Sequence, residues 1–308
     1  MKRVLITGGS GMVGKNLLEH PLAEEYEVLS PTSNELNLSD FETLNRYLIS
    51  QQPDLIVHAA GKVGGIQANI NDPVGYLDQN LLIGRNIIIA ALQNGVKNFL
   101  NLGSTCMYPR GAANPLSETA ILTGSLEPTN EGYALAKIMT SKLCDYITRQ
   151  NSSLNYKTIV PCNIYGRFDK FSPHNSHLIP AIIHKIHAAK IAGSEAVEIW
   201  GDGNARREFM YAGDLSSAIW KAVAEIQCIP SLFNCGLGYD YSINQYYAAV
   251  SEVIGWNGNF VHNLDKPVGM MRKLSDISLQ RAWGFSPATA LSEGLRQTYA
   301  YYLDNQTK

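Results

Sequence analysis

The chain has few charged residues, and neither sign is in excess. Of its 308 residues only 17% are charged, and 25 Lys and Arg stand against 27 Asp and Glu. Proteins that bind nucleic acid or an anionic membrane usually carry a basic surface patch, so neither partner is expected. The sequence also lacks an uninterrupted apolar stretch long enough to span a bilayer.

Cysteine is scarce, and its spacing follows no metal-binding or redox pattern. The cysteines are odd in number and include no CxxC pair, which argues against a disulfide framework and against a zinc site. The two basic residues near the N-terminus precede too few apolar residues for a signal peptide. We therefore expect a reduced, cytoplasmic protein without a metal. The five cysteines are Cys106, Cys144, Cys162, Cys228 and Cys235.

What the chain does have is a regular alternation of short apolar runs and helical patterns. Apolar runs at 4–7, 27–29, 55–60, 98–102 and 157–161 alternate with helical spacing at 12–20, 41–50, 73–94 and 131–150. Such alternation is typical of an α/β fold whose parallel sheet is covered on both faces. The sequence therefore predicts a Rossmann-type doubly wound parallel sheet.

The regularity stops after Pro161, in a loop rich in Pro, His, Asn and Ser. Helices are then expected at 179–192 and 212–226, and strands at 197–200, 207–215 and 232–236. We expect the last two strands to return to the main sheet. This predicts a cofactor-binding domain of residues 1–165 and 206–236 and a smaller mixed α/β substrate-binding lobe of residues 166–205 and 237–308. A ligand is expected between them.

A glycine-rich loop joins the first strand to the first helix. Gly8, Gly11 and Gly14 have the spacing GxxGxxG. Glycine allows a sharp turn, a close approach of backbone amides to a pyrophosphate and tight packing of the helix on the strand. The helix N-terminus adds partial positive charge. Tight turns elsewhere also use glycine, but the strand–turn–helix context favours a dinucleotide site.

The end of the second strand bears on which dinucleotide is bound. A carboxylate there would bind the adenosine ribose and repel a 2′-phosphate. Residues 30–34 are Ser, Pro, Thr, Ser and Asn, and the first carboxylate is Glu35. This favours NADP(H) over NAD, although the segment contains no arginine and is also compatible with an ordinary polar loop.

Three residues form a candidate catalytic set. Tyr133 and Lys137 lie four residues apart on one face of a predicted helix, where the lysine charge would lower the pKa of the phenol. This spacing is also common on helices whose tyrosine only packs and whose lysine is solvated. Ser104 raises its significance, because it lies at the carboxyl end of the fourth strand, where ligands of open parallel sheets bind. The order of glycine loop, Ser104 and Tyr-x-x-x-Lys resembles the extended short-chain dehydrogenase/reductase superfamily.

Cys106 and His177 are two further candidates. Cys106 lies two positions after Ser104, so alternation along an extended segment would point both side chains at one pocket. Singly, a cysteine is usually a small buried hydrophobe, and a histidine usually a surface or capping group. Together they could act as a base and an acid on opposite faces of a sugar ring.

Seven segments resemble the GDP-L-fucose synthase family, and the similarity covers nearly the whole chain. The cysteine and histidine segments discriminate best, because related epimerases and dehydratases share only the glycine loop and the Ser/Tyr/Lys set. The segments are TGGSGMVG (7–14), AAGKVGGI (59–66), LGSTCMYP (102–109), LEPTNEGYALAK (126–137), PCNIYG (161–166), NSHLIPA (175–181) and WGDGNARREF (200–209).

The resemblance implies an NADPH-dependent 3,5-epimerase and 4-reductase of a GDP-4-keto-6-deoxy sugar. Cys106 would be the base and His177 the acid of epimerisation, while Ser104, Tyr133 and Lys137 would serve the reduction. It also implies NADP(H) contacts at Gly8, Gly9, Ser10, Gly11, Met12, Val13, Gly14, Ala59, Ala60, Leu102, Gly103, Ser104, Thr105, Lys137, Pro161, Cys162, Asn163, Ile164 and His177.

For the nucleotide sugar, the family pattern implies contacts at Lys185, Trp200 and Arg207. Each residue could also have a purely structural role. Lys185 could be a solvated helix residue, Trp200 a core residue and Arg207 a member of a surface ion pair. At one position the sequence departs from the pattern, because Val268 stands where the family has an acidic residue. GDP-4-keto-6-deoxyheptoses and 3,6-dideoxyhexoses therefore stay open as substrates, with or without epimerisation.

Two other functional classes are weaker. A non-catalytic NADP-binding sensor would be expected to lose Ser104, Tyr133 or Lys137, and all three are present. A dehydratase would want a carboxylate pair beside Ser104, where the chain has Thr105 and Cys106. By resemblance to extended relatives, which pair long helices across a two-fold axis, we expect a homodimer through the helices at 72–94 and 131–150.

Overall fold

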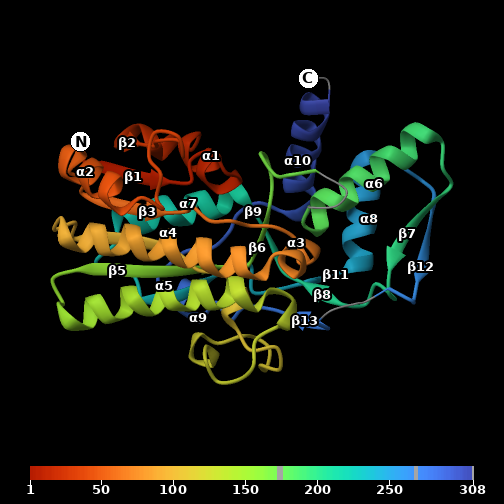
Figure 1. Ribbon diagram of the computed structural model, residues 1–308. Helices are drawn as coiled ribbons and strands as arrows, with labels where there is room; N and C mark the ends of the chain where they lie inside the picture. The colour runs from red at the N-terminus through yellow and green to blue at the C-terminus, as the bar shows by residue number, and fades with distance from the viewer. Residues whose placement is uncertain (172–175, 267–269, 307–308) are drawn as a thin grey trace.

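Six parallel strands form the central sheet of the computed structural model, which describes residues 1–171, 176–266 and 270–306 (Figure 1). The order across the sheet is β10-β5-β4-β3-β1-β2, and every neighbouring pair is parallel. This confirms the predicted doubly wound sheet. The strands are β1 (Arg3–Thr7), β2 (Glu27–Leu29), β3 (Leu55–His58), β4 (Asn98–Leu102), β5 (Asn155–Pro161) and β10 (Leu232–Cys235).

Helices cover both faces of this sheet, and the residues at their ends explain where they begin. Asp40 caps α2 by accepting a bond from the Thr43 amide, and Asp72 does the same for α4 at Gly75. Pro73 occupies the first position of α4, where its missing N–H costs nothing. The helices are α1 (Met12–Leu18), α2 (Phe41–Gln51), α4 (Pro73–Gln93), α5 (Glu131–Gln150) and α7 (Ala212–Ala224).

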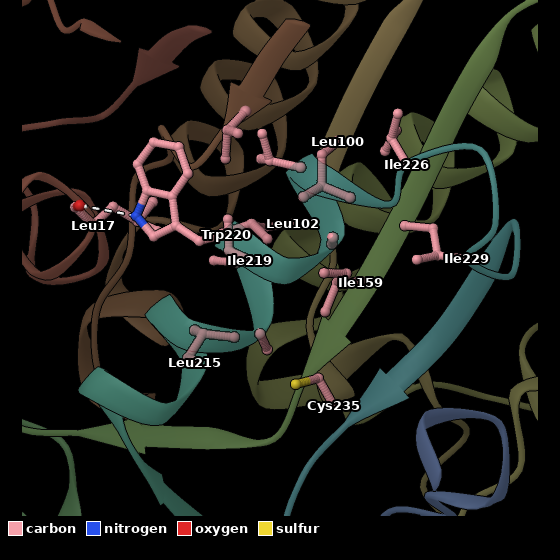
Figure 2. Close-up of a cluster of buried hydrophobic side chains, with 14 of the residues drawn as sticks. Leu17, Leu100, Leu102, Ile159, Leu215, Ile219, Trp220, Ile226, Ile229 and Cys235 are labelled. Carbon is pink, nitrogen blue, oxygen red and sulfur yellow. Dashed lines mark hydrogen bonds between the residues drawn. The ribbon is translucent and has the colours of Figure 1, made fainter. Parts of the chain in front are cut away.

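Alternation along β1 shows how the two helical layers are separated. Val4 and Ile6 pack in a cluster with residues of α1 and α7, whereas Leu5 packs with residues of α2, α4 and α5. In the first cluster, Trp220 is fully buried and donates its indole N–H to the Leu17 carbonyl at 3.0 Å (Figure 2). The sheet and its two helical layers form the sheet domain.

A second unit, the small lobe, is built around α6, α8 and α10, whose apolar residues form a separate core. Its strands make short two- and three-stranded sheets rather than extending the main one. Its main elements are α6 (Leu178–Ala192), β7 (Ala196–Trp200), β8 (Arg206–Arg207), β11 (Tyr241–Ser242), α8 (Ile243–Ile254), β12 (Asn259–Asn263), β13 (Arg272–Lys273) and α10 (Leu291–Gln306).

One part of the predicted topology is wrong. β10 joins the main sheet beside β5 as expected, but residues 207–215 do not form a returning strand. Instead β9 (Phe209–Tyr211) pairs with β6 (Asn163–Tyr165), and α7 begins at Ala212. The second half of the predicted strand is therefore helical, and its first half pairs with β6 outside the main sheet. The predicted domain boundaries stay a prediction.

The remaining elements are short. None of the described helices is long and apolar enough to cross a membrane. Single-turn 3₁₀ helices lie at Pro21–Glu25, Thr105–Met107, Glu118–Ala120 and Pro128–Asn130, with short α-helices α3 (Ile66–Asn71) and α9 (Ser278–Ala282).

Candidate active site

The glycine loop lies between the ends of β1 and β3, where the strand order of the sheet reverses. Gly8 has a φ of +78°, and a Cβ on it would come within 2.6 Å of the Ala60 amide nitrogen. A Cβ on Gly14 would lie 2.5 Å from the Gly9 Cα. Gly11 precedes α1 and offers no side-chain cap, so first-turn amides are free to bind phosphate. The loop fits a dinucleotide.

The end of β2 also fits the adenosine end of NADP(H). Ser30 lies against Gly9, and its hydroxyl oxygen is buried without a hydrogen-bond partner among the described residues. Such a group is usually satisfied by something bound. Glu35, the first carboxylate after the strand, accepts bonds from the Thr32 amide at 2.7 Å and the Thr32 hydroxyl at 2.9 Å. It therefore closes the polar loop.

Ser104, Tyr133 and Lys137 meet at the carboxyl end of β4. Ser104 lies two residues after the end of this strand, and a hydrogen bond joins its side chain to the Tyr133 hydroxyl. Lys137 is buried on α5, 5.8 Å from the centre of the Tyr133 ring, and donates to the Leu102 carbonyl at 2.8 Å. The serine, phenol and ammonium predicted from the motif are therefore one cluster.

The expected effect of Lys137 on Tyr133 is wrong. Burial, followed by the nearby Cys106, raises the pKa of Tyr133 well above its usual value, and the Ser104 hydrogen bond only partly opposes this. Burial also lowers the pKa of Lys137 to about 8, with Cys106 acting in the opposite direction. Tyr133 is thus a protonated phenol near neutral pH, which suits a group that gives a proton to an oxygen.

Cys106 reaches the same cluster by a route different from the one predicted. Ser104 is extended, but the chain turns at Thr105, so the extended segment does not continue to Cys106. Ser104 caps a 3₁₀ turn over Thr105–Met107 and accepts a bond from the Cys106 amide at 3.2 Å, which tightens the chain. The Cys106 sulfur accepts a bond from the Asn130 side-chain amide at 3.1 Å and lies 4.0 Å from Lys273 Nζ.

His177 does not lie at the carboxyl end of β4 but directly before α6. It is the residue that caps this helix, without a side-chain capping bond among the described residues, and its side chain is exposed. Partial enclosure by the surrounding chain, followed by the Lys170 charge, lowers its pKa. A lowered pKa works against an acid role in the free protein. The pairing of His177 with Cys106 stays a prediction.

The three predicted substrate residues lie in the small lobe. Trp200 is not a core residue, because 55% of it is exposed. Lys185 is not merely solvated: it donates to the Glu198 carbonyl at 2.9 Å and lies 5.8 Å from the Trp200 ring centre. Arg207 donates to the Arg206 carbonyl at 2.8 Å, and within the described residues it forms no ion pair. Burial lowers the pKa of Arg207.

Two residues of this site were missed from the sequence. Asn130 stands three residues before Tyr133, just outside the Tyr-x-x-x-Lys motif, and Lys273 comes from a two-residue strand far along the chain. Only the pairing of β13 with β8 brings Lys273 beside Arg207. Val268, where an acidic residue was expected, lies outside the described residues. The predicted cofactor residues of segments 59–60, 102–105 and 161–164 all lie at or near the carboxyl ends of strands.

Comparison with known proteins places this geometry in a family. The NAD dependent epimerase/dehydratase family matches residues 4–236. The GDP-L-colitose synthase of Yersinia pseudotuberculosis is 49% identical over 304 residues, covering 99% of each chain. The GDP-L-fucose synthase of Azorhizobium caulinodans is also 49% identical, over 302 residues that cover 98% of this chain and 96% of the relative.

Solved structures agree with this placement. The GDP-mannoheptose C4 reductase from Campylobacter jejuni, determined with NADP bound, is 28% identical and matches with a TM-score of 0.88 over 98% of each chain. The family expected from the sequence is confirmed, because full-length relatives share nearly half of its residues. The chain belongs to the NAD dependent epimerase/dehydratase family and, within it, to the GDP-L-fucose synthase group that its motifs resemble.

Proposed function

We propose that this enzyme uses NADPH to epimerise carbons 3 and 5 and reduce carbon 4 of GDP-4-keto-6-deoxy-D-mannose, giving GDP-L-fucose. The observation that carries the proposal is the thiol of Cys106 beside the Ser104–Tyr133 pair. A reductase alone needs the serine and the tyrosine. A thiol held next to them supplies the base that an epimerase also needs.

Epimerisation begins at a carbon next to the keto group. The carbonyl at carbon 4 acidifies the protons on carbons 3 and 5, and the Cys106 thiolate removes one of them. Ser104 and Tyr133 donate hydrogen bonds to the carbonyl oxygen and stabilise the negative charge of the enolate. Return of a proton to the opposite face, assigned to His177, inverts the centre.

Reduction uses the same carbonyl. NADPH supplies the hydride that carbon 4 accepts. Tyr133 gives its proton to the oxygen at carbon 4, Ser104 orients that oxygen, and Lys137 holds the nicotinamide ribose. The raised pKa of Tyr133 keeps the phenol protonated until this step.

NADPH preference over NADH follows from the end of β2. The Ser30 hydroxyl at this position has no hydrogen-bond partner among the described residues. The Glu35 carboxylate already accepts a hydrogen bond from the Thr32 amide. Competitive titration should therefore show tighter binding of NADPH than of NADH. Equal affinities would contradict this preference.

The nucleotide end is assigned to the small lobe. The exposed face of Trp200 can stack on a base or sugar. Lys185 and Arg207, which forms no ion pair with any described residue, can bind phosphate oxygens. The experiment that tests the substrate is to offer NADPH with a panel of GDP-4-keto sugars and to determine product stereochemistry by NMR. Conversion of the 6-deoxy-D-mannose derivative to the L-fucose configuration is expected.

A second candidate function is C4 reduction, with or without epimerisation, of a GDP-4-keto-3,6-dideoxyhexose or 6-deoxyheptose in surface polysaccharide synthesis. It is favoured by the GDP-L-colitose synthase relative, by the heptose C4 reductase among the structures, and by Val268 in place of an acidic residue. The panel of GDP-4-keto sugars separates the candidate substrates. Incubation in D₂O shows whether the enzyme also epimerises, since an enzyme that only reduces incorporates no deuterium at carbons 3 and 5.

A homodimer and a cytoplasmic location complete the proposal. α4 and α5 pack on each other, and α5 exposes Met139 and Tyr146 by 55% and 58%. These apolar side chains suit the two-fold helix pairing of extended relatives. Light scattering should give twice the chain mass, and Met139→Glu should lower the measured mass.

The proposed cytoplasmic location rests on the cysteines. All five cysteines are described and free, as in a reducing compartment.

A further inference from the structure

Two strands of the small lobe sort their four cations onto opposite faces. β13 and β8 are parallel, and their register pairs Arg272 with Arg206 and Lys273 with Arg207. Because side chains alternate along a strand, the two pairs point in opposite directions. Arg206 and Arg272 both bind Asp240, each at 2.6 Å, so both cations on that face share one carboxylate partner.

Lys273 lies on the other face and reaches the sheet domain. Its Nζ is 4.0 Å from the Cys106 sulfur, and no ion pair with a carboxylate is found for it among the described residues. The Lys273 side chain is only partly exposed. An ammonium at this distance favours the charged form of a thiol.

The backbone on both sides of Lys273 is held in place. Before it, the Met271 carbonyl accepts a bond from the Arg206 amide at 2.8 Å. After it, the Leu274 amide donates to the Asn114 side chain at 2.8 Å, and the Leu274 carbonyl accepts from Leu116 at 2.7 Å. The fold therefore fixes the backbone position from which the Lys273 side chain extends toward Cys106.

We infer that Lys273 is a positioning residue that stabilises the Cys106 thiolate and so prepares it as the base. This inference rests on the proposed epimerisation. The thiolate takes the proton from the sugar carbon, and the electron pair of that C–H bond moves into the enolate. Lys273 keeps its own proton throughout and balances the negative charge on sulfur before that transfer.

The other groups that face Cys106 do not replace Lys273. Tyr133 and Lys137 approach from α5, and both interact electrostatically with the sulfur. Tyr133 is a neutral phenol, and Lys137 donates to the Leu102 carbonyl. Asn130 donates a hydrogen bond to the sulfur but carries no charge. Lys273 is thus the cation that extends to this thiol from the small lobe.

The test is the rate at which iodoacetamide alkylates Cys106 at pH 7, read peptide by peptide by mass spectrometry on the purified full chain. Only the thiolate reacts, so the rate reports its population. Lys273→Met removes the charge at similar length and should lower the rate about tenfold or more. Lys273→Arg keeps the charge and should restore most of it.

Two controls accompany these variants. Lys97→Met removes an exposed lysine at the amino end of β4, whereas Cys106 follows the carboxyl end of this strand. The change should therefore leave the Cys106 rate unchanged. Cys228 is exposed, and its alkylation should be the same in every variant. A Cys106 rate in Lys273→Met within twofold of the unmutated protein would overturn the inference.

The inference stays testable if Lys273→Met does not fold. Lys273→Gln then supplies a second neutral side chain. The unmutated protein gives an independent measurement: if its Cys106 were alkylated no faster than free N-acetylcysteine, the inference would also be overturned. Alkylation needs neither sugar nor hydride. If deuterium exchange were absent but alkylation depended on Lys273, the proposed epimerisation would fail while the charge effect stood. If Lys273 only bound the diphosphate beside Arg207, exchange would fall with alkylation unchanged.

Discussion

The residues assigned to reduction and those assigned to epimerisation are held in different ways. Ser104, Tyr133 and Lys137 come from one strand end and the helix that follows, and Lys137 is buried against the strand. Cys106 and Lys273 come from a single 3₁₀ turn and a two-residue strand of the other lobe. Under the proposed assignment, reduction would depend on one supersecondary unit, whereas epimerisation would depend on how two units meet. The second chemistry can change while the first is kept.

The largest effect is expected from Tyr133→Phe. This change removes the proton donor of reduction, so NADPH oxidation followed at 340 nm should fall roughly 10²–10⁴-fold. Deuterium exchange at carbons 3 and 5 should fall less, because Cys106 and the Ser104 hydrogen bond remain. Tyr47→Phe, at a half-buried position on α2, is the control and should change neither. Reduction at a near-normal rate would contradict the role of Tyr133.

A second large effect is expected from Gly14→Ala. The added Cβ would lie 2.5 Å from the Gly9 Cα, which forces the cofactor loop to shift and should weaken NADPH binding about tenfold or more in titration. Exchange measured without NADPH should persist. Gly111 has open space around it, so Gly111→Ala is the matched control. Equal NADPH affinities of Gly14→Ala and the unmutated protein would show that the loop does not hold the cofactor.

These two glycines also show what sequence can predict. Gly8 and Gly14 were identified from local spacing because the strand, turn and helix that need them are contiguous in the chain. The Ser104–Tyr133–Lys137 cluster was predictable for the same reason, through one strand and one helix. Lys273 and Asn130 carry no motif, since their place depends on β13 pairing with β8 and on a side-chain bond to sulfur.

Three expectations failed because local pattern was overridden. Alternation predicted an extended segment at 104–106, but the Ser104 side chain bonds the Cys106 amide and closes a turn. Lys137 was expected to lower the pKa of Tyr133, but burial of the phenol raises this pKa instead. Residues 209–211 have strand character, but they pair with β6 instead of extending the main sheet.

The smallest effect concerns pH. Burial lowers the pKa of Lys137 to about 8, so its charge is present below that pH and lost above it. The kcat/KM of reduction should therefore fall about fivefold between pH 8 and pH 9. Tyr133, whose pKa is raised, stays protonated in that window. Lys137→Arg keeps its charge and should remove the fall. A profile that is unchanged in Lys137→Arg would assign the fall to another group.

The most direct test of separable chemistries is Cys106→Ser incubated in D₂O. A serine hydroxyl is hardly ionised at neutral pH, so proton abstraction should collapse and carbons 3 and 5 should incorporate almost no deuterium by mass spectrometry. Ser104, Tyr133, Lys137 and the cofactor loop are untouched, so added NADPH should still reduce carbon 4, giving a GDP-D-rhamnose-like product. Full exchange in Cys106→Ser, or loss of reduction together with exchange in a folded protein, would contradict the account.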